Sequence, residues 1–154
     1  MPSDPENFSS SDTGESPRDG VALGSLSTTS VYSPRLVEHA VHPRNQGSME
    51  HPDAVGTARF ERCGDRMRLE FRLSEGRVQE VRCQAFGCGA AVAAGSAATE
   101  LLAGRTLGEA RALTAFELDE ALGGVPAPKR HALLMVLECI AGALGGRPPD
   151  HSHP

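Results

Sequence analysis

Hydrophobic and polar side chains alternate along residues 65–73, which predicts a strand with one buried face. The apolar members of the alternation are Met67, Leu69, Phe71 and Leu73. Three arginines and a glutamate occupy the positions between them. A period of two with one polar side is typical of an antiparallel strand that covers a core.

Two further strands are expected beside this one. The run Ser74-Glu75-Gly76 predicts a turn. A return strand should then extend from about Val78 to Ala85, with Val81, Cys83 and Ala85 facing inward. A weaker alternation from about Val55 to Glu61 completes a three-stranded antiparallel sheet.

The apolar period changes after Gly87. Residues from Gly89 to Leu102 are almost all Ala, Val, Gly and Leu, which predicts a helix buried on all sides. Other helices are expected where N-capping residues precede apolar stripes. They are Pro34 to about Val41 after Ser33, about Leu107 to Leu113, about Ala115 to Leu122 after Thr114, and about Pro128 to Leu144 with a stripe of Leu133, Leu137, Ile140 and Leu144. The predicted class is α+β, a small three-stranded antiparallel sheet covered by about four to five helices.

Charge is distributed unevenly along the 154 residues. Of the net charge of -5, residues 1–30 carry -4, from five acids and one base. This segment is also rich in Ser, Gly and Pro, so we expect it to be disordered. The same holds for residues 146–154, where His151 and His153 are expected to be solvated. One folded domain should therefore span residues 31–145.

The bulk properties exclude several classes of protein. A near-neutral folded part gives no reason to expect nucleic-acid binding. No apolar run reaches the roughly 18 residues that a membrane span needs, and the acidic start lacks the features of a targeting peptide. We therefore expect a cytoplasmic protein, in which the four cysteines are metal ligands, reactive thiols or core residues rather than disulfides.

Cys63 precedes the strongest predicted strand, in the run Arg62-Cys63-Gly64-Asp65. Gly64 permits a tight turn, so Cys63 and Asp65 are expected to project together from one loop tip. A thiolate and a carboxylate at this spacing can hold one metal ion. A surface cysteine beside a glycine turn is also a common feature without function.

Cys88 lies where the return strand meets the buried helix, between Gly87 and Gly89. The free N–H groups of a helix N-terminus stabilise a thiolate, so this cysteine is a candidate ligand or nucleophile. His131 is expected in the first turn of the last helix, where a histidine is usually a solvated or capping residue. The nearby Lys129 would attract an anionic cluster or an acidic partner.

The remaining cysteines are predicted to be core residues. Cys83 shares the inward face of its strand with Val81 and Ala85, and Cys139 lies between Leu137 and Ile140 in the last helix. A buried cysteine behaves as a small hydrophobic residue. A redox role for this pair lacks the exposed, electropositive setting that reactive cysteines need.

Several of these runs, taken in order, resemble the NifU/IscU family of iron–sulfur cluster scaffolds. The resemblance covers about residues 31–144 and includes a further run, Thr99-Glu100-Leu101, before Gly104-Arg105-Thr106-Leu107. The motifs that carry it are Tyr32-Ser33 to Glu38-His39, Pro43-Arg44-Asn45-Gln46-Gly47, Asp53-Ala54-Val55-Gly56, Cys63-Gly64-Asp65-Arg66-Met67, Phe86-Gly87-Cys88-Gly89-Ala90-Ala91-Val92-Ala93-Ala94-Gly95-Ser96 and Pro128-Lys129-Arg130-His131. It implies a SufE/NifU-like fold.

The resemblance also implies a function and a ligand set. Such proteins build a [2Fe-2S] cluster from iron and from sulfur that a cysteine desulfurase supplies, and hand it to carriers and apo iron–sulfur proteins. The implied ligands are Cys63, Cys88 and His131, with Asp65 as an exchangeable ligand and with Gly64, Gly87 and Lys129 in support. Nitrogen and oxygen ligands should hold a cluster less tightly than four thiolates, as a donor requires. The sequence leaves open whether a cluster bridges two chains.

One position departs from the family pattern. Relatives usually have a cysteine directly after the histidine of the third motif, where this chain has Ala132. Cys139 is a poor substitute, because it lies seven positions further on, about 10 Å along a helix. Sulfur would have to arrive at Cys63, at Cys88 or as free sulfide. Val125-Pro126-Ala127-Pro128 also differs from the family motif that engages a specialised Hsp70 chaperone, so that partner is not assigned.

Three alternatives to a working scaffold remain. Cys63, Asp65, Cys88 and His131 are all ligands that zinc accepts, so the domain could be a structural zinc module. Ala132 also fits a divergent paralogue that binds assembly partners without making clusters. An enzyme with a Cys88 nucleophile and His131 as base is the least supported alternative, because no oxyanion site or substrate pocket is evident in the sequence.

Overall fold

The computed structural model describes residues 32–145, which form a three-stranded sheet and five α-helices. The predicted α+β class is confirmed. In chain order the elements are α3 (Pro34–Val41), β2 (Ala54–Phe60), β3 (Asp65–Ser74), β4 (Arg77–Phe86), α4 (Gly89–Leu102), α5 (Leu107–Arg111), α6 (Ala115–Ala121), a 3-10 turn (Ala127–Lys129) and α7 (His131–Leu144). The expected disorder of residues 1–30 and 146–154, with the two tail histidines, lies outside the described residues.

The sheet is antiparallel with the strand order β2-β3-β4. The turn between β3 and β4 is tight, because Glu75 and Gly76 both have positive φ, 52° and 75°, as the favoured hairpin turns require. At the opposite end of the sheet, Phe60 pairs with Asp65 and Arg66 pairs with Phe86. The ends of all three strands therefore meet there.

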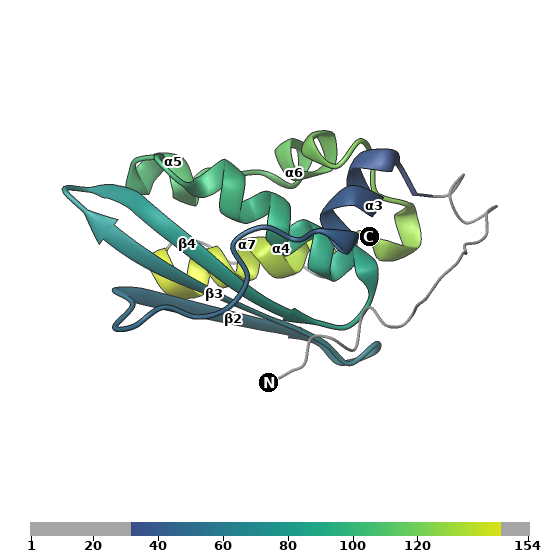
Figure 1. Ribbon diagram of the computed structural model, residues 1–154, viewed down its shortest axis with the longest axis horizontal. Helices are drawn as coiled ribbons and strands as arrows, with labels where there is room; N and C mark the ends of the chain where they lie inside the picture. Colours follow the sequence, from purple (N-terminus) through teal and green to yellow (C-terminus); the bar gives the residue numbers. More distant parts are fainter. Residues whose placement is uncertain (1–31, 146–154) are drawn as a thin grey trace.

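All five helices lie on one side of the sheet, with α4 and α7 directly against it (Figure 1). The alternation predicted for β3 is confirmed for Met67, Leu69 and Phe71, which are buried, whereas Leu73 is only half-buried. Glu70 is an exception, because it was expected on the exposed face but is 3% exposed. Its carboxylate accepts a hydrogen bond from the N–H of Met49 at 2.8 Å, so the chain before β2 covers it.

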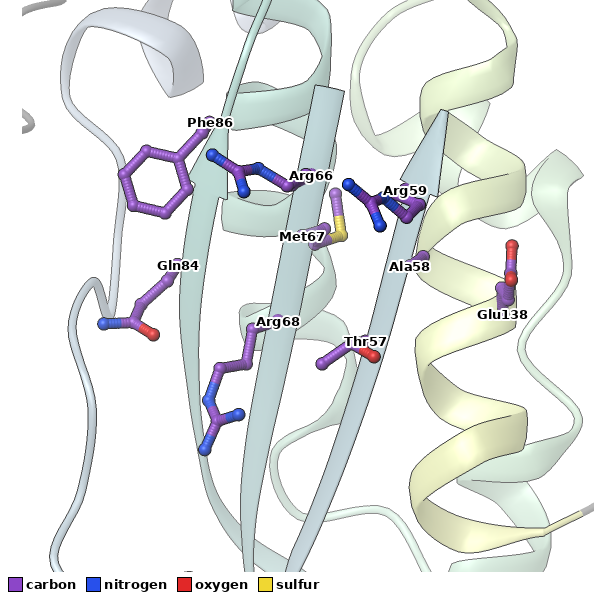
Figure 2. A pocket seen from close by; sticks show the side chains of 9 residues that line it. All are labelled: Thr57, Ala58, Arg59, Arg66, Met67, Arg68, Gln84, Phe86 and Glu138. Atoms are coloured by element: carbon purple, nitrogen blue, oxygen red, sulfur yellow. The ribbon is translucent and has the colours of Figure 1, made fainter. Parts of the chain in front are cut away.

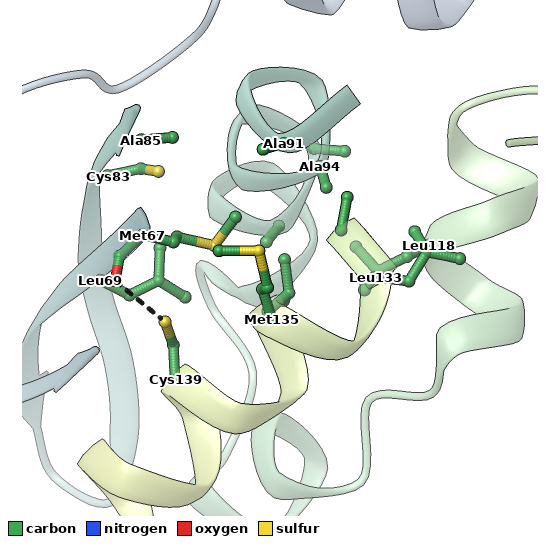
Figure 3. Close-up of a cluster of buried hydrophobic side chains, with 14 of the residues drawn as sticks. Met67, Leu69, Cys83, Ala85, Ala91, Ala94, Leu118, Leu133, Met135 and Cys139 are labelled. Atoms are coloured by element: carbon green, nitrogen blue, oxygen red, sulfur yellow. Dashed lines mark hydrogen bonds between the residues drawn. The ribbon is translucent and has the colours of Figure 1, made fainter. Parts of the chain in front are cut away.

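Helix α4 has the predicted bounds and is buried along most of its length. Its alanines and glycine let it approach the sheet closely, since a Cβ at Gly95 would lie 2.4 Å from Sγ of Cys83. Figure 3 shows how side chains of β3 and β4 meet those of α4 and α7, with Leu118 of α6 beside Leu133. Cys83 and Cys139 are both fully buried in this core, as predicted.

The last helix differs from its prediction in two respects. It begins at His131 and not near Pro128, because i→i+3 hydrogen bonds from Lys129 and Arg130 form a 3-10 turn first. The buried stripe is also broader than expected. Leu137 and Leu144 are half-buried, while the fully buried residues are Ala132, Leu133, Met135, Val136, Cys139 and Ile140. Among the described residues, no helix is both long and apolar enough for a membrane span.

Candidate metal centre

Three potential metal ligands converge where three elements begin. Asp65 is the first residue of β3, Cys88 is the N-cap of α4 and His131 is the first residue of α7. One ligand atom from each lies within 4.8 Å of the other two. Among the described residues this is the one group of three or more such ligands that could share a metal ion.

The carboxylate of Asp65 is the centre of this group. It is 1% exposed, and its Oδ1 accepts a hydrogen bond from the backbone N–H of Cys88 at 3.2 Å. Its Oδ2 lies 3.3 Å from Sγ of Cys88 and 2.9 Å from Nε2 of His131. A buried carboxylate thus contacts both the thiol and the imidazole and holds them in place.

Gly87 makes room for that carboxylate. Its φ is +134°, and a Cβ at this position would lie 2.1 Å from Oδ1 of Asp65. Any side chain there would displace the carboxylate and strain the backbone. The supporting role expected for Gly87 therefore has a steric basis in the described geometry.

The imidazole of His131 is fixed by an aromatic neighbour. Its ring stacks on Phe60 at the end of β2, with ring centroids 4.1 Å apart and an interplanar angle of 13°. Sequence reasoning missed this contact. The available signal was an aromatic residue at the end of the weakest strand, close to the Cys63 loop.

The electrostatic setting of Cys88 corrects one expectation. A helix N-terminus was expected to stabilise its thiolate, but partial burial raises the pKa of the Cys88 thiol above its usual value. The hydrogen bond from the N–H of Ala91 and the charge of Lys129 lower this pKa, while the neighbouring Asp65 carboxylate raises it further. Desolvation outweighs the helix terminus, so Cys88 is a thiol at neutral pH and must lose its proton to bind metal.

Cys63 does not join the group of three. The turn before β3 is tight as predicted, with Gly64 at φ +72°. Cys63 is exposed in that turn, whereas Asp65 is buried within the sheet. The expectation that both residues project from one loop tip is therefore wrong, because β3 begins at Asp65 and turns its side chain inward.

Other residues of the sequence motifs stabilise the fold through hydrogen bonds to α4. His39 of α3 bonds through Nδ1 to Oγ of Ser96 at 2.7 Å. The same hydroxyl accepts from the N–H of Arg44, at 2.8 Å, and Asn45 donates to Oγ1 of Thr99. These contacts fix residues 42–47 against α4.

The four cysteines are expected to differ in their rates of alkylation. Burial raises the pKa of Cys83 to about 12 and also raises the pKa of Cys139, so both stay protonated at pH 8. With iodoacetamide at pH 8, exposed Cys63 should react first and Cys88 more slowly, while Cys83 and Cys139 should react only in denaturant. Mass spectrometry of timed samples measures this order, and labelling of Cys83 as fast as Cys63 would contradict the packing described above.

The donor set suits a borderline or soft metal. Thiolate and imidazole bind zinc and iron well, and a carboxylate completes a three-ligand site with an open position. An open position is what a site needs if its metal is to be exchanged or built upon. A fourth protein ligand would have to come from the adjacent turn, where Cys63 lies.

Comparison with known proteins assigns the chain to a family. Residues 31–146 match the family described as "NifU-like N terminal domain". The chain is 37% identical over 114 residues to "Iron-sulfur cluster assembly scaffold protein IscU 1" of Archaeoglobus fulgidus, covering 74% of each protein. It is 42% identical over 111 residues to "Bifunctional protein NifU/MnmA" of Rubrobacter xylanophilus, of which it covers only 23%.

A solved structure supports the fold. A putative iron–sulfur cluster assembly scaffold protein for the SUF system from Fervidobacterium islandicum superposes with a TM-score of 0.62. The alignment covers 76% of this chain and 98% of that protein, at 19% sequence identity. At this identity the match is evidence for the fold alone.

Proposed function

Because this chain belongs to the family of NifU-like N-terminal domains, we propose that it is a scaffold on which an iron–sulfur cluster is assembled and then passed to other proteins. The observation that carries the proposal is the convergence of Asp65, Cys88 and His131 within 4.8 Å. The cluster is cargo, so the protein acts by binding and releasing it and not as an enzyme.

The geometry suggests how iron enters. A metal ion that binds Sγ of Cys88 must displace the thiol proton, and Oδ2 of Asp65 lies 3.3 Å away to accept it and pass it to water before the carboxylate itself binds iron. Nε2 of His131 bonds to the same oxygen. Asp65 therefore holds both donors until iron arrives, and Lys129 adds a nearby positive charge that favours the thiolate.

Cys63 is the proposed fourth ligand. It lies two residues before Asp65, in the turn between β2 and β3. We infer that this turn moves when iron binds and brings the thiolate over the open side of the site. Two thiolates, one imidazole and one carboxylate would then supply two ligands to each iron of a [2Fe-2S] cluster. The cluster would be held within one chain or would bridge two chains.

Sulfur delivery must proceed without a third cysteine at the site. Ala132 is fully buried and offers no sulfur. We propose that a cysteine desulfurase delivers sulfur to Cys63 or Cys88, and that carriers or apo iron–sulfur proteins receive the finished cluster. The test is anaerobic reconstitution with ferrous iron and sulfide, followed by visible absorption and transfer to an apo-ferredoxin.

Replacement of Asp65 is expected to slow cluster loss. In Asp65→Ala the exchangeable carboxylate is gone, and the thiol loses a neighbour that raises its pKa, so the thiolate ligand is favoured. The decay of visible absorbance in air should be slower than in the parent. Asp65→Asn is the matched control for shape, and equal lifetimes in Asp65→Ala and the parent would refute this role of Asp65.

A structural zinc site is the second candidate, because a thiolate, an imidazole and a carboxylate within 4.8 Å also suit zinc. It predicts one tightly held zinc, a large loss of stability on chelation and no colour after reconstitution. A paralogue that only binds assembly partners would give neither metal nor colour, but would co-purify with a desulfurase. Zinc content alone does not decide, since zinc can occupy a scaffold that lacks iron.

A further inference from the structure

A groove of about 520 Å³ lies at the Phe60–Asp65 end of the sheet, on the face opposite the helices, and Glu138 of α7 also contributes to its lining. Strand register places two rows of side chains across it. The first row is Arg59, Arg66 and Phe86, and the second is Thr57, Arg68 and Gln84. Figure 2 shows these six side chains along β2, β3 and β4. We refer to these two rows as the arginine face.

Among the residues that line the groove, three arginines outnumber one carboxylate, that of Glu138. The guanidinium of Arg66 lies 6.0 Å from the ring centroid of Phe86. Arg59 is paired with Glu61 at 3.7 Å, but both side chains are more than half exposed, so this pair neutralises little. Arg68 is paired more tightly with Glu70, at 2.7 Å.

The arginine face also offers apolar surface. The side chain of Phe86 is 45% exposed, beside the aliphatic stem of Arg66. Arginine beside an exposed aromatic ring suits an acidic peptide that also carries an aromatic side chain, since the carboxylates meet the guanidinium groups and the ring packs on the apolar part.

We propose that the occupant of this face is an acidic segment of the same chain, residues 4–19. The segment contains Asp4, Glu6, Asp12, Glu15 and Asp19 with a single base, Arg18. Its one aromatic residue, Phe8, lies between the first two and the last three of these acids. Charge and aromatic character thus both match the arginine face.

Because residues 4–19 are covalently attached to the domain, they are favoured over a free partner as the occupant of the arginine face. Asp19 lies thirteen positions before Tyr32, where the described structure starts, and this stretch can span about 45 Å. A domain of this size has a radius of gyration of about 13 Å, so the segment can reach the far face. Tethering raises its local concentration to on the order of millimolar, enough for a weak electrostatic contact to form.

Docking would cover the end of the sheet that adjoins the metal centre. Arg66 directly follows Asp65, and Phe86 lies two residues before Cys88. Because side chains alternate along a strand, the arginine face and the ligands lie on opposite sides of the same strand ends. The segment would then compete with any acidic partner that approaches this edge, without touching the ligands themselves.

A tryptophan reporter tests the proposal in the full, metal-free chain. The protein has no tryptophan, so Phe8→Trp introduces a single indole. Its emission at low salt should be blue-shifted and protected from acrylamide. In 1 M salt the Debye length falls to about 3 Å, so the electrostatic contact is screened. The emission should then shift to the red, and quenching by acrylamide should rise at least about twofold.

Charge reversal distinguishes this face from general attraction. Adding Arg59→Glu and Arg66→Glu to the reporter should give the high-salt spectrum already at low salt, with far-UV circular dichroism unchanged. Arg111→Glu, on α5 in the helical layer, is the control and should leave the spectrum as in the reporter alone. The proposal would be overturned by an indole that is equally exposed in all three proteins, or by an Arg111→Glu variant that exposes the indole as much as the double charge reversal does. It would also be overturned if an added acidic peptide bound the protein without displacing the indole.

Discussion

A Cys88→Ser variant, reconstituted anaerobically with ferrous iron and sulfide, is expected to lose the visible charge-transfer bands that the parent acquires. Cys88 is the one thiol whose sulfur already lies among the converging ligand atoms. A hydroxyl keeps the hydrogen bond to Asp65 but is a poor ligand for a soft cluster. Loss of an outer-shell partner alone typically costs about 10–100-fold in metal affinity, so the loss of a direct ligand should exceed tenfold in cluster per chain.

The control for this experiment is Cys139→Ala, which removes a thiol from the core and none from the site. Cys139 is fully buried and its sulfur contacts the carbonyl of Met67, so the variant should be less stable but should still acquire colour. Bands that survive in Cys88→Ser would show that the cluster sits elsewhere. A parent that remains colourless would show that Ala132 has removed the chemistry, and the zinc or partner-binding interpretation would replace the scaffold.

The sheet and helices could be predicted from sequence because their signals are local. The alternation in β3 and the alanine-rich run of α4 each lie within one element, and both elements have nearly the bounds expected. Glu70 shows where such reasoning stops. Its polar character predicts exposure, but the chain around Met49, 21 positions earlier, covers it and donates a hydrogen bond to its carboxylate. The alternation of polar and apolar residues within β3 contains no information about that distant contact.

Of the four predicted ligands, Asp65, Cys88 and His131 lie together in the structure, whereas Cys63 lies apart in an exposed turn. Each of these three belongs to a sequence motif, yet Cys88 lies 23 positions and His131 66 positions after Asp65. Their convergence follows only once β3, α4 and α7 are packed together. The raised pKa of Cys88 likewise depends on how many atoms surround the sulfur, which the local helix-terminus rule does not include.

The second large effect expected is on stability, from a methyl group added to β2. Gly56 is buried where β2 crosses α7, and a Cβ there would lie 1.8 Å from the carbonyl oxygen of Cys139 and 3.1 Å from the backbone nitrogen of Ala143. Both neighbours are backbone atoms of a helix, so neither can swing aside as a side chain could. The strand and the helix would have to separate, which opens the core around Cys139.

Gly56→Ala should therefore destabilise the fold by about 3 kcal/mol or more, at the upper end of typical overpacking effects, and lower Tm by about 10 °C or more. Gly108→Ala is the matched control, because no atom outside α5 lies within 4 Å of its added Cβ, and helix propensity predicts a gain of about 0.5–1 kcal/mol. Thermal and urea unfolding of both variants measure the contrast. A Tm for Gly56→Ala within a degree of the parent would mean that α7 can shift away from β2 at little cost. Since α7 begins at His131, such a freely moving helix could not hold the imidazole against Asp65, and the preorganised site would lose its structural basis.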